Sequence, residues 1–240
     1  MDLTVLTFNL EYNKGFPKLL RVIQQYQPDI VALQEFQMSD DAVTLLEEKG
    51  YTLAEYSEAF KRNVGIFSVA TFYKAKKVVL KGSGTIFLPR GIWEVIELIW
   101  RGFSRRLVIS THFLVDGQAL SLFNVHLSPY SANSLRNKQL FKTLEEAYLA
   151  DSPTIILGDF NYPYNRSHLE SLFLKYEFKE ASNNILHTFY KTVRFLPIKF
   201  KLDYIFYRRL ENIQTKKINA FTTDHTPIIA TFRISKEKIS

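Results

Sequence analysis

The sequence contains no cysteine, which excludes disulfide bonds, thiol nucleophiles and cysteine-ligated metal sites. Any bound metal ion would therefore be held by oxygen or imidazole ligands. Glycine and proline are scarce, at 9 and 8 residues, which argues against a disordered chain. No stretch approaches the roughly 18 uncharged apolar residues of a membrane span, since the nearest, residues 91–100, contains Glu94 and Glu97. A transmembrane helix is therefore excluded, whereas contact with a membrane surface is not.

The residues that are present indicate a globular protein. Hydrophobic residues make up 46% of the chain and aromatic residues 15%, enough to bury a sizeable core. A length of 240 residues favours one domain spanning residues 1–240, and we expect a monomer. Asp2 stands where a signal peptide carries positive charge, so we expect no export signal and a cytoplasmic protein. The net charge of +7 weakly favours polyanionic partners, either nucleic acid or an anionic lipid surface.

The spacing of apolar residues predicts strands and helices in alternation at first, and hairpins later. Strands are predicted at residues 3–10, 29–36, 64–73, 105–115, 120–127, 154–161, 201–208 and 227–234. Helices are predicted at residues 17–26, 40–50, 134–149 and 167–176. Asp116 and Gly117 are typical of a hairpin turn. This mixture predicts a layered α/β protein with mixed sheets.

Several apolar strands end in a carboxylate, an amide or an imidazole, which is an unusual place for such groups. The residues concerned are Asn9, Glu35, His126, Asp159, Asn161 and the pair Asp224 and His225, with Asp203 near the start of another strand. Each taken alone has an ordinary explanation, as a turn cap or a satisfied core group. Because packed strands bring their ends to a common rim, we expect these side chains to converge on one site.

Three of these residues, Glu35, Asp159 and Asp224, would repel one another at such a rim. At about 4 Å and an effective dielectric constant of about 20, each pair of carboxylates repels by roughly 4 kcal/mol. That is a large share of the stability of a typical domain, so a cation must offset it. Carboxylate and amide oxygens are hard ligands, which suit Mg²⁺ or Mn²⁺ better than zinc.

The motifs TFNL, LQE, NVHL, GDFN, LDYIF and TDH occur in this order between Asn9 and about Phe232. Together they resemble the endonuclease/exonuclease/phosphatase superfamily, whose members are similar to deoxyribonuclease I. The resemblance implies a four-layer α/β/β/α sandwich with two mixed β-sheets. It also implies a Mg²⁺-dependent phosphodiesterase that hydrolyses phosphoester bonds by in-line attack of water.

The same resemblance implies roles for single residues. Glu35 would be the principal Mg²⁺ ligand, with Asn9 beside it contacting metal-bound water or phosphate. Asp224 would support a second metal position. His225 would act as the general base, or as an acid that contacts phosphate, and Asp203 would orient its ring.

Around the phosphoryl group, the resemblance implies that Asp159 and Asn161 position the nucleophile and stabilise the transition state. His126 would donate a hydrogen bond to the phosphoryl group from the opposite side, and Gly158 would let the backbone turn close to the phosphate.

Two features qualify this picture, and two further residues are implied to support it. The TDH motif begins with Thr223 where serine is commoner, a mild change that keeps the hydroxyl. His126 stands where AP endonucleases have tyrosine, which counts against abasic-site repair. Arg136 and Gln139 would brace the rim without taking part in catalysis.

Residues 190–201 alternate basic and aromatic side chains, a pattern that can follow a phosphate backbone and stack on bases. The predicted substrate-binding residues are Lys191, Arg194, Lys199 and Lys201. The alternative is an ordinary strand with its aromatic residues in the core and its lysines in solvent. We therefore favour a nuclease acting on DNA or RNA over a phospholipid or small-molecule phosphoesterase.

Residues 84–102 form an apolar stretch that contains Trp93 and Trp100. We expect this stretch to be a buried strand or hairpin. The alternative is an aromatic wedge that enters lipid headgroups, as in a sphingomyelinase-like enzyme. The exposure of the two tryptophan side chains distinguishes these interpretations.

Overall fold

The computed structural model describes residues 2–219 and 223–234, and its first sheet contains six strands in the order β13-β14-β1-β2-β4-β3. Their bounds are β1 Asp2–Asn9, β2 Ile30–Phe36, β3 Thr52–Arg62, β4 Gly65–Tyr73, β13 Glu211–Lys217 and β14 Ile228–Arg233. Strands β1 and β2 are parallel, and the other neighbours are antiparallel. The sheet is therefore mixed.

The second sheet also contains six strands, in the order β5-β6-β7-β8-β12-β9. Their bounds are β5 Val78–Phe87, β6 Leu107–Val115, β7 Gln118–His126, β8 Thr154–Asp159, β9 Lys179–Glu180 and β12 Asp203–Arg208. Here β7 and β8 are the parallel pair. A separate hairpin is formed by β10 (Phe189–Val193) and β11 (Leu196–Phe200).

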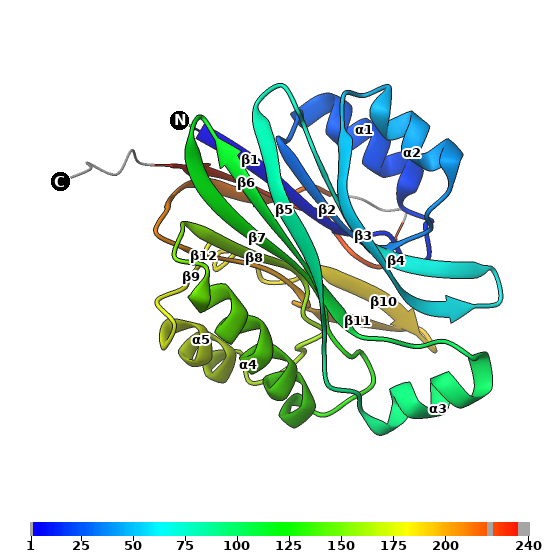
Figure 1. The fold of residues 1–240 in the computed structure, drawn as a ribbon. Helices are drawn as coiled ribbons and strands as arrows, with labels where there is room; N and C mark the ends of the chain where they lie inside the picture. The colour runs from blue at the N-terminus through cyan, green and yellow to red at the C-terminus, as the bar shows by residue number, and fades with distance from the viewer. Residues whose placement is uncertain (1, 220–222, 235–240) are drawn as a thin grey trace.

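Helices cover the outer faces of the two sheets, which lie face to face (Figure 1). The helices α1 (Phe16–Tyr26) and α2 (Asp40–Glu47) pack on the first sheet, and α4 (Asn133–Leu149) and α5 (Arg166–Leu174) pack on the second. The predicted α/β/β/α sandwich with two mixed sheets is thus confirmed.

The central strands are apolar on both faces because each face packs against another layer. In β1 and β2, Val5 and Ala32 belong to the cluster between the two sheets. Their neighbours Leu6 and Leu33 belong to the cluster under α1 and α2. This double burial explains the nearly continuous hydrophobic runs of these strands.

The chain between β5 and β6 corrects one prediction. Residues Ile92–Arg101 form a helix, α3, where we expected a buried strand or hairpin. The helix begins where the Glu94 carboxylate accepts a hydrogen bond from the Gly91 N–H, at 2.9 Å, and it ends at Gly102, whose φ is 71°. Trp93 and Trp100 are 53% and 84% exposed, so neither belongs to the core. No helix within the described ranges is long and apolar enough to cross a membrane.

Candidate active site

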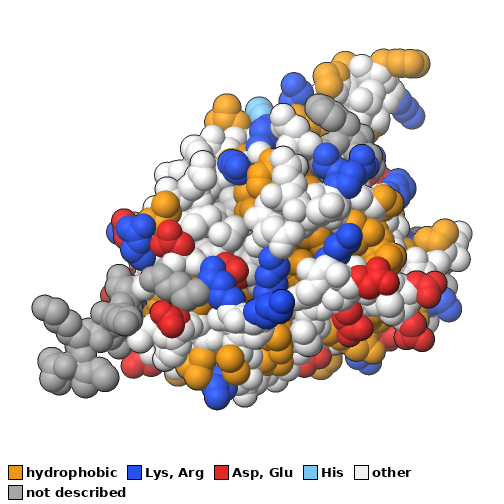
Figure 2. Space-filling model, turned by 90° about the horizontal axis from the view of Figure 1, so that it is seen from above, with side chains coloured by type: hydrophobic (Ala, Val, Ile, Leu, Met, Phe, Trp, Pro, Cys, Tyr) orange, Lys and Arg blue, Asp and Glu red, His pale blue; other side chains and the backbone are white. Residues whose placement is uncertain are grey.

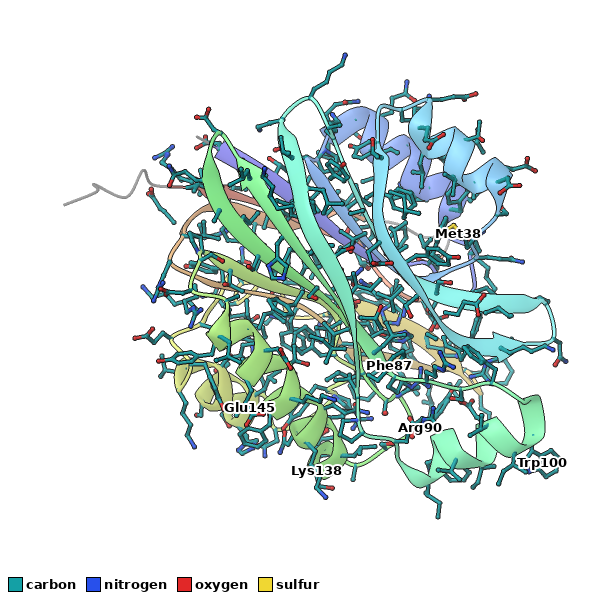
Figure 3. All side chains as sticks on the ribbon, in the orientation of Figure 1. Met38, Phe87, Arg90, Trp100, Lys138 and Glu145 are labelled. Carbon is teal, nitrogen blue, oxygen red and sulfur yellow. The ribbon has the colours of Figure 1, made fainter. Side chains whose placement is uncertain are left out.

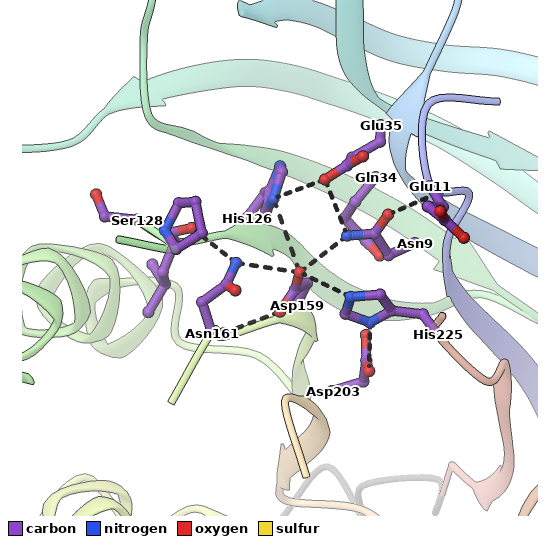
Figure 4. A network of polar contacts seen from close by, with 12 residues as sticks. Asn9, Glu11, Gln34, Glu35, His126, Ser128, Asp159, Asn161, Asp203 and His225 are labelled. Carbon is purple, nitrogen blue, oxygen red and sulfur yellow. Dashed lines mark hydrogen bonds and ion pairs between the residues drawn. The ribbon is translucent and has the colours of Figure 1, made fainter. Parts of the chain in front are cut away.

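The polar strand ends meet at one edge of the sandwich. Asn9 ends β1 and pairs in register with Gln34 of β2, while His126 ends β7 and pairs in register with Asp159 of β8. These are the two parallel pairs, one in each sheet, so the ends of both lie at the same edge (Figure 4). The topology therefore places side chains from distant parts of the sequence around one point.

The Asp159 carboxylate lies at the centre of this group (Figure 4). It accepts hydrogen bonds from Asn9 Nδ2 at 2.9 Å and from the Asn161 backbone N–H at 2.9 Å. The Nε2 atoms of His126 and His225 lie 3.7 and 3.8 Å from its Oδ2. Burial is the main cause that raises the pKa of Asp159, to about 7. The site therefore leaves negative charge at Asp159 only partly compensated.

His225 is held in place by a second carboxylate. Its Nδ1–H donates to Asp203 Oδ2 at 2.8 Å, and the Asp203 backbone N–H donates to Thr188 Oγ1 at 3.0 Å. Burial alone would lower the pKa of His225, but Asp203 and Asp159 outweigh burial and raise it to about 10. The ring orientation leaves Nε2 directed toward Asp159 (Figure 4).

Glu35 reaches the same edge through an irregularity in β2. The pairing of β2 with β4 shifts register between Leu33 and Phe36, and Glu35 has a positive φ of 54°. A bulge of this kind redirects a side chain out of the regular alternation. Its carboxylate accepts hydrogen bonds from the Tyr12 N–H at 3.0 Å and from Asn9 Nδ2 at 3.4 Å. Burial is the main cause that raises the pKa of Glu35.

Asp224 precedes His225 in the chain and also lines the cleft. Its backbone N–H donates to Glu11 Oε2 at 2.7 Å, and its Oδ2 lies 3.9 Å from Lys191 Nζ. Its Oδ1 is buried without a hydrogen-bond partner among the residues that the structure describes. Burial is the main cause that raises the pKa of Asp224.

The donor set fits a hard divalent cation. The buried carboxylates have raised pKa values, and the unpartnered Asp224 oxygen offers a free ligand atom. The ligand atoms of Asp159, Asp203 and His225 also lie within 4.8 Å of one another. Because Asp203 already accepts the His225 hydrogen bond, its carboxylate is less available to a cation than those of Glu35 and Asp224.

A cleft of about 330 Å³ opens over this group. Of the predicted site residues, its lining includes Glu35, His126, Asp159, Asn161, Lys191, Asp224 and His225. Asn9 and Asp203 do not line the cleft, but they bind residues that do. The predicted convergence on one shared cavity is therefore found.

The model of the Endonuclease/Exonuclease/phosphatase family matches residues 6–225, nearly the whole chain. The chain belongs to this family. Membership makes the protein a phosphoesterase and confirms the resemblance drawn from the six motifs.

One relative in sequence and two solved structures are similar to this chain. A UPF0294 protein of Photorhabdus laumondii is 24% identical over 239 residues, covering 96% of this chain and 84% of that protein. The human Nocturnin catalytic domain with bound sulfate anion has a TM-score of 0.77 at 18% identity, covering 98% of this chain and 95% of that one. TDP2 of D. rerio, complexed with single strand DNA product, has a TM-score of 0.74 at 19% identity, covering 97% of this chain and 99% of that one.

The structure shows a steric reason for the glycine at position 158, in the GDFN motif. Gly158 has a φ of 136°, and a Cβ there would lie 2.1 Å from the Val125 carbonyl oxygen of β7. Glycine is required here because β8 approaches the β7 backbone closely. The expectation that Gly158 also lets the backbone turn close to a phosphate stays a prediction.

The four predicted substrate-binding residues have different surroundings. Lys191 lines the cleft, and Arg194 and Lys199 are exposed on the β10–β11 hairpin. Lys201 is buried, and its ammonium group binds the Glu180 carboxylate, while burial lowers its pKa to about 8. The structure removes Lys201 from the set, because its ammonium group is not available to a polyanion.

Arg136 and Gln139 brace the loop that follows β7, as expected. Arg136 donates to the backbone carbonyls of Ser128 at 2.9 Å and Pro129 at 2.7 Å. Gln139 accepts from the Ser128 N–H at 3.2 Å and donates to its hydroxyl at 2.8 Å. Pro129 lines the cleft, so these buried residues fix its edge from behind.

Several cleft residues were missed by the sequence analysis. They are Glu11, Tyr12, Phe60, Arg62, Arg106 and Tyr130. Arg106 is buried, its Nε lies 3.4 Å from Glu94 Oε1, and its charge adds to burial in lowering the pKa of His126. The sequence signal that could have predicted a buried arginine was the Arg105–Arg106 pair before β6. Side chains alternate between the two faces of an extended chain, so one of two neighbouring arginines points inward.

Proposed function

We propose that this phosphoesterase is a Mg²⁺-dependent phosphodiesterase in which water attacks the phosphorus in line with the leaving oxygen. The observation that carries the proposal is that His225, whose Nδ1–H donates to Asp203, and Asp159 line a cleft that also contains Glu35. A carboxylate, an imidazole and a second carboxylate in this order can orient a base and place the atom that it deprotonates.

In this mechanism His225 Nε2 accepts a proton from the attacking water when its ring is neutral, and a cation held by the nearby carboxylates would favour the neutral ring by lowering the pKa of His225 from about 10. Asp203 fixes the ring through Nδ1. Asn161 and His126 donate hydrogen bonds to the phosphoryl oxygens from the side opposite His225. Asn161 Nδ2 donates to the Leu127 carbonyl oxygen and to Asp159 Oδ2, each at 3.1 Å, so its second N–H would turn from Asp159 to a phosphoryl oxygen when substrate binds. These donors act while charge spreads over the transferring group.

Glu35 and Asp224 would hold the cation, with Asn9 beside them. The cation would offset the carboxylate charge and polarise the phosphoryl oxygens. The raised pKa values of Glu35 and Asp224 support this assignment, because each carboxyl group lacks a sufficient positive partner within the described residues. Mn²⁺ would satisfy the same hard oxygen ligands.

Nucleic acid is the substrate class that we propose first. Lys191 lines the cleft and Arg194 and Lys199 extend along the hairpin, where Tyr190 and Phe200 are 36% and 39% exposed. These aromatic side chains are not core residues, which removes the alternative of an ordinary strand. Figure 2 views the molecule from above, relative to Figure 1. It shows several Lys and Arg side chains over the middle of this face, in agreement with the net charge of +7.

Reversing the hairpin charge tests this substrate class. We expect Arg194→Glu with Lys199→Glu, both exposed on the hairpin outside the cleft lining, to raise KM for single-stranded DNA or RNA about tenfold or more, because each lost phosphate contact weakens binding and lowers its salt dependence. Hydrolysis of bis(p-nitrophenyl) phosphate, which has no extended backbone, would change little. Lys175→Glu with Lys179→Glu, elsewhere on the surface, is the matched control. Equal KM values for DNA in the two double variants would argue against nucleic acid.

A phosphodiester in a lipid headgroup is the second candidate. The exposure of Trp93 and Trp100, which distinguishes the two interpretations of residues 84–102, favours the lipid alternative for this segment. A sphingomyelin or phospholipid arm therefore belongs in any substrate panel.

Metal removal tests the reaction itself. We expect EDTA to abolish hydrolysis of plasmid, single-stranded DNA, RNA, bis(p-nitrophenyl) phosphate or sphingomyelin, whichever is cleaved, and Mg²⁺ or Mn²⁺ to restore it. Zn²⁺ would restore it less well, because the site lacks soft ligands. Full activity in EDTA after dialysis would contradict the proposed mechanism.

A further inference from the structure

Helix α3 presents its apolar residues to solvent and its acidic residues to the protein. Glu94 is 1% exposed and binds Arg106, and Glu97 binds Arg62 at 3.0 Å and accepts from Ser104 Oγ at 3.3 Å. The outward residues are Ile92 (74% exposed), Trp93 (53%), Val95 (43%), Ile96 (36%), Ile99 (74%) and Trp100 (84%). Figure 3 shows Arg90 at the base of the helix and Trp100 at its far end, away from the sheets.

This orientation is the reverse of that of an ordinary surface helix, which buries its apolar side. The buried Arg106 determines it. Arg106 is 3% exposed and would be left as an unpaired buried charge if α3 turned Glu94 outward. The fold therefore keeps a continuous apolar surface in water, and such surfaces mark binding sites.

The charge around this surface is positive. Residues 84–106 contain four arginines, Arg90, Arg101, Arg105 and Arg106, and two acidic residues, both on the inward side of α3. Arg90 and Arg105 are exposed beside the helix. An apolar surface with tryptophans and a basic margin is typical of segments that lie at the headgroup level of anionic bilayers. Ten residues are too few to span a bilayer, so the helix would lie in its plane.

The β10–β11 hairpin forms a second exposed apolar segment, and its base lines the active-site cleft. Phe195 and Leu196, at the tip of the β10–β11 hairpin, are 98% and 70% exposed, next to Arg194. The base of this hairpin supplies Phe189 and Phe200 to the cleft lining, and the arginines that anchor α3 line it too. Figure 1 shows α3 and the β10–β11 hairpin toward the same end of the sandwich.

We propose that α3 docks the protein on the surface of an anionic phospholipid bilayer, with Trp93 and Trp100 at the headgroup level. A second copy of the chain is a poorer partner, because a two-fold contact through α3 would bring Arg90 and Arg105 of each copy together. The proposal goes beyond the proposed hydrolysis and does not depend on it, since docking requires no reaction in the cleft.

The two tryptophans of the chain, Trp93 and Trp100, both lie on α3, so intrinsic tryptophan fluorescence reports on this helix alone. With vesicles of phosphatidylcholine and phosphatidylglycerol in equal parts, we expect emission to shift to shorter wavelength and acrylamide quenching to fall. The protein would also sediment with these vesicles, and less with vesicles of phosphatidylcholine alone. No spectral shift and no sedimentation with either vesicle would overturn the proposal.

Replacement of the tryptophans separates docking from folding. Trp93→Ser with Trp100→Ser should weaken sedimentation with the mixed vesicles at least about tenfold, since both side chains lose their contact with lipid. Leu149→Ser with Leu174→Ser, at positions 78% and 68% exposed on α4 and α5, is the matched control and should bind as the unchanged protein does. Both double variants should hydrolyse bis(p-nitrophenyl) phosphate equally.

Three outcomes would contradict docking through α3. Undiminished vesicle binding by the tryptophan variant would assign docking to another surface. Equal weakening by the leucine variant would indicate a nonspecific effect of lost hydrophobicity. Concentration-dependent dimers that vanish in the tryptophan variant, without vesicle binding, would assign the helix to contact between copies.

Discussion

Replacement of His225 by alanine is expected to lower kcat for phosphodiester hydrolysis about 10²- to 10⁴-fold, the usual contribution of a general base. KM should change little, because the proposed cation ligands remain. The expected loss follows from the geometry, in which Nε2 lies 3.8 Å from Asp159 Oδ2 at the wall of the cleft. Steady-state kinetics with Mg²⁺ and bis(p-nitrophenyl) phosphate measure it.

Asp203→Asn distinguishes a positioning role from a direct one. Alone it should reduce kcat less than His225→Ala, since the imidazole remains but loses its oriented Nδ1–H partner. Added to His225→Ala it should cost no further activity, because Asp203 acts through the ring. His112→Ala on β6, whose ring contacts Ser121 at 2.9 Å, is the control for loss of a half-buried histidine. Near-normal turnover of His225→Ala would refute the assignment of the base.

The success of the strand predictions depends on a strand's place in its sheet. Every inner strand of both sheets was predicted, and the strands that were missed in the two sheets are their edges, β3, β13, β5 and β9. Inner strands are buried on both faces and form apolar runs, as in Thr154–Asp159, all of whose residues are buried. An edge strand such as Val78–Phe87 alternates with exposed residues and includes two glycines, so its pattern resembles that of a loop.

Helix α3 was missed for a different physical reason. Its apolar residues indicated burial, yet the carboxylates of Glu94 and Glu97 are the groups that face the protein. Their partners Arg62 and Arg106 lie in other elements, and no local pattern joins them to the helix. When the buried charges of a helix are paired with residues elsewhere in the chain, its orientation cannot be predicted from hydrophobicity alone.

The site was predictable where residues end inner strands. Asn9, His126 and Asp159 needed only the rule that neighbouring strand ends meet. Lys201 and Arg106 were not predictable from pattern, because each is a buried cation whose position depends on one partner, Glu180 or Glu94. The alternation of side chains along a strand would place Lys201 in solvent. It also does not determine whether Arg105 or Arg106 points inward.

Gly158→Ala is expected to destabilise the fold more than any other single methyl group added at a described glycine. The new Cβ would lie 2.1 Å from the Val125 carbonyl oxygen and 2.9 Å from its carbonyl carbon and nitrogen, all backbone atoms that cannot rotate away. Overpacking costs about 1 to 3 kcal/mol, and a disfavoured backbone region about 1 to 3 kcal/mol more, against a total of about 5 to 15 kcal/mol. Urea unfolding measures the loss.

Two other glycines separate the causes of that loss. Gly50→Ala meets open space at a φ of 83° and tests backbone strain alone, whereas Gly82→Ala meets open space without positive φ and should be nearly neutral. If Gly158→Ala cost no more than Gly50→Ala, the close approach of β8 to β7 would not be a constraint. If it costs more, relief of the clash must move Asp159 away from His126, its partner in register, and activity should fall even under conditions where the variant is folded. Gly158 would thus affect the proposed catalysis through the spacing of β7 and β8.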